Sequence, residues 1–134
     1  MNSSVMKCPC SPDKEFSNCC KPFIDGIQQA STPALLMRSR YSAYATGNID
    51  YLLRTTHSTE RGNYTRKDLE EWSLGTKWLK LEILRVEEYR VEFKAYFIGK
   101  NGVEEVHHEL STLFHENGEW YFVDGIFGDQ IYDF

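Results

Sequence analysis

The sequence has no long hydrophobic run and no apolar stretch at its start. A helix that crosses a membrane needs about 18 consecutive apolar residues, and no segment of the 134 residues approaches that length. Residues Met1–Lys7 do not supply the apolar core of a signal peptide. We therefore expect a cytoplasmic protein that does not contact a membrane.

The chain also lacks an excess of positive charge. Its 15 Lys and Arg residues stand against 20 Asp and Glu residues, and a net charge of −5 repels a phosphate backbone. General nucleic-acid binding is therefore not expected. The 41% of hydrophobic and 14% of aromatic residues suffice for one compact core. We expect one main domain with at most a small appendage.

Common catalytic signatures are absent as well. The sequence contains no Gly-rich phosphate loop, no Gly-x-Ser-x-Gly elbow and no His-Glu-x-x-His motif. His107 and His108 are neighbours on an expected strand, so they should point to opposite faces and cannot easily share a metal. These absences favour a binding protein over an enzyme.

Cysteine is absent after residue 20 and concentrated before it, at Cys8, Cys10, Cys19 and Cys20. Without an export signal thiols stay reduced, and clustered cysteines then bind metal more often than they form disulfides. Two close pairs separated by a short loop can place four thiolates tetrahedrally around Zn²⁺. We predict a structural zinc site with these four ligands, with disulfides and free thiols as the alternatives.

A structural zinc site is closed, because four protein ligands leave no position open for water. The cysteine cluster should therefore hold shape and carry out no hydrolysis. A segment of this size is too small to fold by burial alone, which explains why the cysteines gather there. We interpret residues 1–25 as a zinc-binding appendage, the knuckle.

The knuckle resembles a known motif through Cys8-Pro9-Cys10, Phe16 and Cys19-Cys20. This pattern is similar to the SEC-C motif, a zinc-binding segment also found in the preprotein translocase motor SecA. The sequence departs from the motif at Ser11-Pro12 and Asp13, but the cysteine spacing is intact. In SecA the motif docks to the chaperone SecB and to ribosomes, so the resemblance implies a protein partner here.

Residues 32–47 carry clear signals for a helix. Thr32 can cap its start, Pro33 suits its first turn and Gly47 can end it. The apolar face of this helix has Arg40 near its middle, and the face is formed by Leu36, Met37, Tyr41 and Tyr44. We expect Arg40 to be buried and paired with a carboxylate, because an unpaired buried charge is costly. The alternative is a guanidinium that reaches out to solvent.

The period of the sequence changes from helical to strand-like after residue 75. A short helix is expected from Asp50 and another over Arg66–Leu74. Four segments rich in Val, Ile and aromatic residues then predict strands, over Trp78–Glu88, Tyr89–Gly99, Val103–His115 and Glu119–Gly125. Asn-Gly pairs between the later segments indicate hairpins. The sequence thus predicts an α+β domain whose antiparallel sheet curls around the helices.

This layout, with the runs Leu36–Tyr44 and Asp50–Leu53, resembles the YchJ-like family. Members combine a SEC-C motif with a domain of the nuclear-transport-factor-two-like (NTF2-like) fold, which corresponds here to residues 26–134. The resemblance implies a cone-shaped, curved antiparallel sheet packed on N-terminal helices. The family has no assigned molecular function, so the resemblance implies a fold and not an activity.

A candidate pocket follows from the strand alternation and the resemblance together. Glu109 and Ser111 share one strand face, and the resemblance places that face inward. Glu109 would then meet Arg40, with Asp124 as a second candidate. The predicted pocket residues are Arg40, Tyr44, His57, Trp78, Glu109, Ser111 and Asp124. They could bind a small anionic or amide-bearing ligand, or form a purely structural ion pair.

Two functions are compatible with these features. The first is a zinc-stabilised binding module, in which the knuckle docks a protein and the cone holds a small ligand. The alternative is an enzyme of the hydratase or isomerase type, with Glu109 or Asp124 as base and Tyr44 or His57 assisting. An exposed sheet face would also favour a homodimer.

Overall fold

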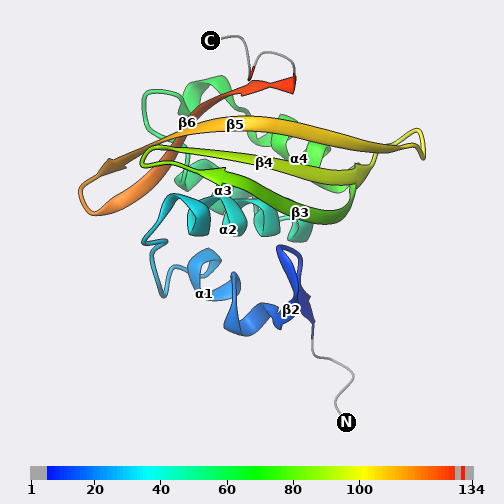
Figure 1. Ribbon diagram of the computed structural model, residues 1–134, viewed down its shortest axis with the longest axis horizontal. Coiled ribbons are helices and arrows are strands. Elements are labelled where there is room, and N and C mark those ends of the chain that lie inside the picture. The colour runs from blue at the N-terminus through cyan, green and yellow to red at the C-terminus, as the bar shows by residue number, and fades with distance from the viewer. Residues whose placement is uncertain (1–5, 129–130, 132–134) are drawn as a thin grey trace.

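Helix α2 (Pro33–Thr46) is the central layer of the molecule, with the knuckle on one side and the sheet on the other (Figure 1). The computed structural model describes residues 6–128 and residue 131. The remaining elements in chain order are β1 (Lys7–Cys8), β2 (Ser11–Glu15), α1 (Lys21–Ile24), α3 (Ile49–Arg54), α4 (Arg66–Leu74), β3 (Lys77–Val86), β4 (Arg90–Ile98), β5 (Glu104–Glu116) and β6 (Glu119–Phe127), with 3-10 turns at Phe16–Asn18 and Arg61–Asn63.

The expected capping residues set the helix boundaries. The Thr32 side chain accepts a hydrogen bond from the backbone N–H of Leu35 at the start of α2. Gly47 ends the same helix with a φ of 76°, a left-handed conformation that glycine adopts without strain. Thr65 caps α4 in the same way as Thr32 caps α2. The predicted helices are therefore confirmed to within one or two residues.

The four long strands form one antiparallel sheet in the order β3-β4-β5-β6, which confirms the predicted meander and the α+β class. In the described part of the chain β3 and β6 are the two edges of this sheet, which is therefore open. Its concave face packs against α2, and the pairing of β4 with β5 places Phe93 opposite Glu109 and Val91 opposite Ser111. This register brings the polar residues of β5 onto the same face as the aromatic core.

Strand β6 contains an irregularity that changes which residues face inward. Leu113 pairs with Phe122, whereas Thr112 pairs with Asp124, so Val123 is an extra residue on β6. An extra residue reverses the alternation of side chains along a strand. As a result Phe122 and Gly125 both face the helices, while Asp124 turns to the exposed side.

The segment that follows the cysteines is helical and partly buried. Residues Lys21–Ile24 form helix α1, which has Cys20 as its N-cap and Pro22 in its first turn. Ile24 is buried in the same cluster as Leu36 and Met37 of α2. The knuckle and the NTF2-like part therefore share one hydrophobic core. Among the described residues no helix is both long and apolar enough to cross a membrane.

Candidate metal centre and cavity

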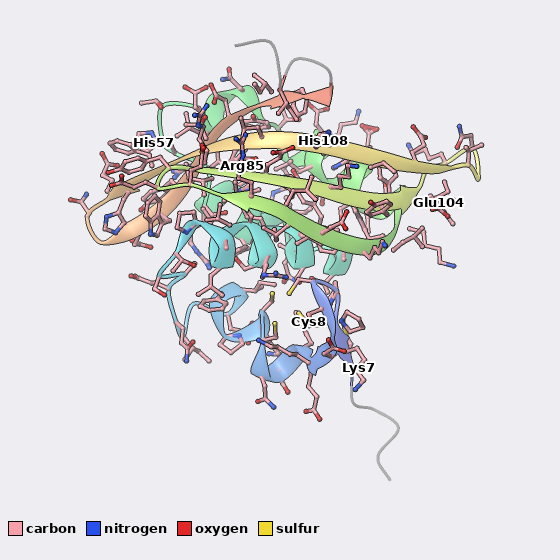
Figure 2. All side chains as sticks on the ribbon, in the orientation of Figure 1. Lys7, Cys8, His57, Arg85, Glu104 and His108 are labelled. Atoms are coloured by element: carbon pink, nitrogen blue, oxygen red, sulfur yellow. The ribbon has the colours of Figure 1, made fainter. Side chains whose placement is uncertain are left out.

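The four cysteine sulfurs converge between the knuckle and α2 (Figure 2, near the labelled Cys8). The Sγ atom of Cys10 lies 3.6 Å from that of Cys8, 3.6 Å from that of Cys19 and 3.5 Å from that of Cys20. Thiolates bound about 2.3 Å from a central ion in a tetrahedron lie ~3.8 Å apart, whereas disulfide sulfurs lie about 2.05 Å apart. The geometry therefore fits a tetrahedral metal site and excludes disulfides in this arrangement.

The thiols perturb one another strongly because they are buried side by side. Hydrogen bonds from Cys10 and Cys20 lower the pKa of Cys8, because they stabilise its thiolate. Burial, together with the interaction with Cys8, raises the pKa of Cys19. Four thiolates in one place need a compensating cation, which a bound metal ion supplies.

Two residues of α2 hold the knuckle in place. The Ser42 hydroxyl lies 3.5 Å from the Cys8 sulfur, and Nη1 of Arg38 donates to the carbonyl of Cys10 at 3.4 Å. Ser42 is completely buried, so its contact with Cys8 is not in competition with water. Hydrogen bonds of this kind around a metal site orient its ligands.

A cavity of about 220 Å³ lies between α2, α4 and the concave face of the sheet. Most of its wall is aromatic, and the lining residues are Met37, Arg40, Tyr41, Tyr44, Tyr64, Trp72, Trp78, Phe93, Ala95, His107, Glu109, Phe122 and Phe127. The buried Nε1 of Trp78 has no hydrogen-bond partner in the part of the chain that the structure describes. The cavity thus combines apolar walls with a few polar groups, as ligand sites do.

Arg40 is buried as expected, with an exposed fraction of 5%, but none of its direct partners among the described residues is a carboxylate. Its Nη1 donates to the carbonyl of Leu52 at 3.0 Å and to the hydroxyl of Thr55 at 2.7 Å. Its guanidinium also lies 4.6 Å from the centre of the Phe122 ring. Burial lowers the pKa of Arg40, and the nearby Tyr44 and Glu109 oppose that shift. The predicted direct ion pair is therefore wrong: backbone and hydroxyl oxygens at the end of α3 take its place.

Glu109 instead binds two residues of its own strand. Its Oε1 lies 2.7 Å from Nε2 of His107, and its Oε2 accepts a hydrogen bond from the Ser111 hydroxyl. The three residues are two apart on β5, so they share the inner face. The sequence prediction omitted His107 from the pocket, although the same two-residue alternation places it beside Glu109.

Gly125 makes room for this arrangement. A Cβ atom at this position would lie 2.7 Å from Cδ of Glu109, which is too close for any side chain. Gly125 pairs with Ser111 across β5 and β6, so the carboxylate rests against bare backbone.

We expect Gly125→Ala to push the Glu109 carboxylate aside at a small cost in stability, about 1 kcal/mol, because a side chain can move where backbone cannot. The loss in binding free energy of a cavity ligand should then be larger than the loss in the free energy of unfolding. Denaturant unfolding and ligand titration of the same variant measure the two effects. A variant that keeps full ligand affinity would show that the position of Glu109 does not matter for binding.

Two of the predicted pocket residues lie elsewhere. His57 packs between Phe114 and Tyr121, and its Nε2 lies 3.1 Å from Glu116, at the hairpin end of the sheet (Figure 2). Its backbone N–H donates to the carbonyl of Phe122, which fixes its side chain on that side. Asp124 is turned outward by the extra residue on β6. The structure brings Arg40, Tyr44, Trp78 and Glu109 together at the cavity, with Ser111 behind Glu109.

Comparison with known proteins identifies relatives along most of the chain. Residues 32–125 match the family model of the YchJ middle NTF2-like domain. A UPF0225 protein of Geobacter sulfurreducens is 39% identical over 125 residues, which cover 88% of this chain and 77% of the relative. A UPF0225 protein of Haemophilus influenzae is 40% identical over 128 residues, covering 90% and 78% of the two chains.

Two solved structures share the fold. A SEC-C motif containing protein from Rhodopseudomonas palustris has a TM-score of 0.83 and 35% identity, covering 92% of this chain and all of the other. A second SEC-C motif protein, from Psychrobacter arcticus, has a TM-score of 0.77 and 32% identity, covering 92% and 84%. With the cysteine cluster and the cavity placed as described, the chain belongs to the YchJ (UPF0225) family of proteins that join a SEC-C motif to an NTF2-like domain.

Proposed function

We propose that this protein binds a small, neutral ligand carrying an amide or another carbonyl group in the cavity under α2. The observation that carries the proposal is the polar content of an otherwise aromatic wall. Arg40 supplies positive charge, Glu109 supplies negative charge, and neither is in direct contact with the other. A ligand that spans both groups can accept from one and donate to the other.

The charges of the two groups favour an amide over a carboxylate. Arg40 and Glu109 carry opposite charges, so a ligand carboxylate would be attracted by Arg40 and repelled by Glu109. An amide places its oxygen near Arg40 and the unpartnered Trp78 Nε1, and its N–H near Glu109. A volume of about 220 Å³ lies below the usual range for drug-sized ligands, so the ligand is ring-sized.

Benzamide and benzoate, which have the same shape, test this proposal. We expect benzamide to raise the melting temperature and to quench tryptophan fluorescence saturably, because Trp72 and Trp78 line the cavity. Benzoate should bind more weakly. If neither compound changes melting temperature or fluorescence at millimolar concentration, the cavity is not a site for such ligands.

The variant Tyr44→Phe removes one donor and keeps the ring, and should weaken benzamide binding by up to about tenfold, as expected for one neutral hydrogen bond. Tyr44 lines the cavity together with Arg40. Tyr89→Phe is the matched control, because Tyr89 is exposed, contacts Trp120 and does not line the cavity. Equal losses in the two variants would argue against a role for Tyr44.

We also propose that the metal is zinc and that it is structural. The support comes from a set of four thiolates at tetrahedral spacing, with no position left for water. Metal analysis of the purified chain should find one zinc per chain, lost when Cys10 and Cys19 are both changed to Ser. A folded protein without metal would contradict the proposal.

The knuckle is proposed to dock a protein partner, as the SEC-C motif does in SecA. A hollow of about 600 Å³ beside the cysteines supports this proposal, because its wall offers both cationic groups, Lys14 and Arg38, and apolar groups, Phe23 and Leu35. Such a surface suits an acidic, partly apolar segment.

Co-sedimentation with ribosomes and co-elution with SecB test the docking. We expect retention with at least one of them, and a loss of about tenfold in affinity for Lys14→Glu. Lys67→Glu on α4 is the control, since this lysine is exposed and distant from the knuckle in sequence. Absence of retention by either partner would contradict docking through the knuckle in the manner of SecA.

A further inference from the structure

We propose that His107 is a general base that removes a proton from a carbon next to the carbonyl of the cavity ligand. The inference rests on the proposed function in one respect, namely that a carbonyl ligand occupies this cavity. It goes beyond that function by assigning a reaction, enolisation, and a residue that carries it.

The hydrogen bonds of Glu109 determine which nitrogen of His107 can act as base. Both oxygens of Glu109 are occupied as acceptors, one by the Ser111 hydroxyl and one by Nε2 of His107 at 2.7 Å. Nε2 therefore carries the imidazole proton, and the lone pair is left on Nδ1. Nδ1 has no hydrogen-bond partner among the described residues. A carboxylate that fixes the tautomer of a histidine in this way prepares the other nitrogen to accept a proton.

The position of His107 suits that role. It lines the cavity, and its side chain keeps an exposed fraction of 33%, so the imidazole can release the proton to solvent. Its ring packs between Phe93 and Phe127, which limits its rotation. Glu109 is buried and held by Ser111 and the gap at Gly125, so it acts as a positioning residue.

The reaction balances without any cofactor. The C–H bond beside the carbonyl breaks, and its proton passes to Nδ1 of His107. The electron pair of that bond forms a C=C bond, and the carbonyl π pair moves onto oxygen to give an enolate. Donors from Arg40 and Tyr44 across the cavity stabilise the oxygen. The imidazolium then returns a proton to the same carbon, or to a conjugated one in an isomerisation.

The same strand provides a matched control. His108 points to the opposite face of the sheet, where its Nε2 lies 2.7 Å from Oε2 of Glu92, the same distance as in the His107 pair. Figure 2 shows His108 with Arg85 on the outer face of the sheet, away from α2–α4. Neither His108 nor Glu92 lines the cavity. The two histidines thus have similar carboxylate partners and differ in whether they meet the ligand.

The test uses phenylacetone, a ring-sized ketone with an acidic CH₂ group, in D₂O. Proton NMR follows the loss of the CH₂ signal as deuterium replaces hydrogen, and fluorescence titration gives the dissociation constant. We expect the protein to accelerate exchange above buffer, His107→Gln to reduce the accelerated rate by about 10²-fold or more, and His108→Gln to leave it unchanged. Thermal unfolding of each variant confirms that it is folded.

Glu109→Gln separates positioning from binding. The neutral amide of the new side chain stabilises the imidazolium less than the carboxylate does, so the exchange rate should fall by about 10²-fold. The dissociation constant of phenylacetone should change little, because this ketone has no N–H for Glu109 to accept. Binding without accelerated exchange, or equal rates in the wild type and His107→Gln, would overturn the proposal and leave the binding function intact. Absence of phenylacetone and benzamide binding would overturn both.

Discussion

Loss of the metal is expected to unfold the knuckle and to destabilise the whole chain by several kcal/mol. Metal binding by small thiolate sites supplies folding free energy, about 10–16 kcal/mol in isolated zinc fingers. The change that tests this is Cys10→Ser, because the Cys10 sulfur lies within 3.6 Å of those of Cys8 and Cys19 and 3.5 Å from that of Cys20. Removal of one thiolate leaves an incomplete tetrahedron around the ion.

The effect should reach beyond the knuckle because the two parts share a core. Four residues of the knuckle are buried in one cluster with Leu36 and Met37 of the central helix, namely Cys8, Cys10, Cys20 and Ile24. Nη2 of Arg54, at the end of α3, also donates to the carbonyl of Ile24 at 3.3 Å. Unfolding of the knuckle would expose one side of α2 and remove these contacts.

Denaturant unfolding measures the loss of stability. Addition of a strong zinc chelator and the change Cys10→Ser should each lower the denaturant concentration at the unfolding midpoint. The matched control is Ser17→Ala, an exposed position between the two cysteine pairs that should change stability by less than about 0.5 kcal/mol. If chelation removes the metal and the unfolding midpoint stays in place, the metal does not support the fold.

The fold could be read from the sequence because its local signals agree with one another. Thr32 and Gly47 mark the two ends of α2, and both have the capping geometry that the sequence predicts. Alternation along β5 correctly placed Glu109 and Ser111 on one face. These signals act within a few residues, and nothing elsewhere in the fold opposes them.

The site was harder to predict because it depends on contacts between distant segments. The extra residue at Val123 turns Asp124 outward, and the local sequence of β6 does not predict this irregularity. Arg40 was expected to meet a carboxylate, but the end of α3 supplies the Leu52 carbonyl and a threonine hydroxyl instead. His107, by contrast, is predictable from the sequence, since the alternation that places Glu109 in the cavity also places His107 there.

Arg40→Met should lower stability by about 2 kcal/mol and ligand affinity by about 10–100-fold. Hydrogen bonds to a charged donor contribute about 1.5–3 kcal/mol, and Nη1 of Arg40 makes three of them, to Leu52, Thr55 and Thr56. Burial of the guanidinium costs energy, as its lowered pKa indicates, and methionine removes that cost. The net loss of stability is therefore smaller than the sum of the bonds.

The loss of affinity has no such compensation, which is what distinguishes a binding role for Arg40 from a structural one. Methionine fills the space of the side chain but donates nothing to a ligand carbonyl, so benzamide titration should show a larger effect than unfolding does. Arg66→Met is the control, because the pair of Arg66 with Asp50 is exposed and screened by solvent, so its loss should leave both stability and affinity nearly unchanged. If Arg40→Met keeps full affinity and loses only stability, the guanidinium serves to join α2 to α3, and the ligand carbonyl must be held by Tyr44 and Trp78 alone.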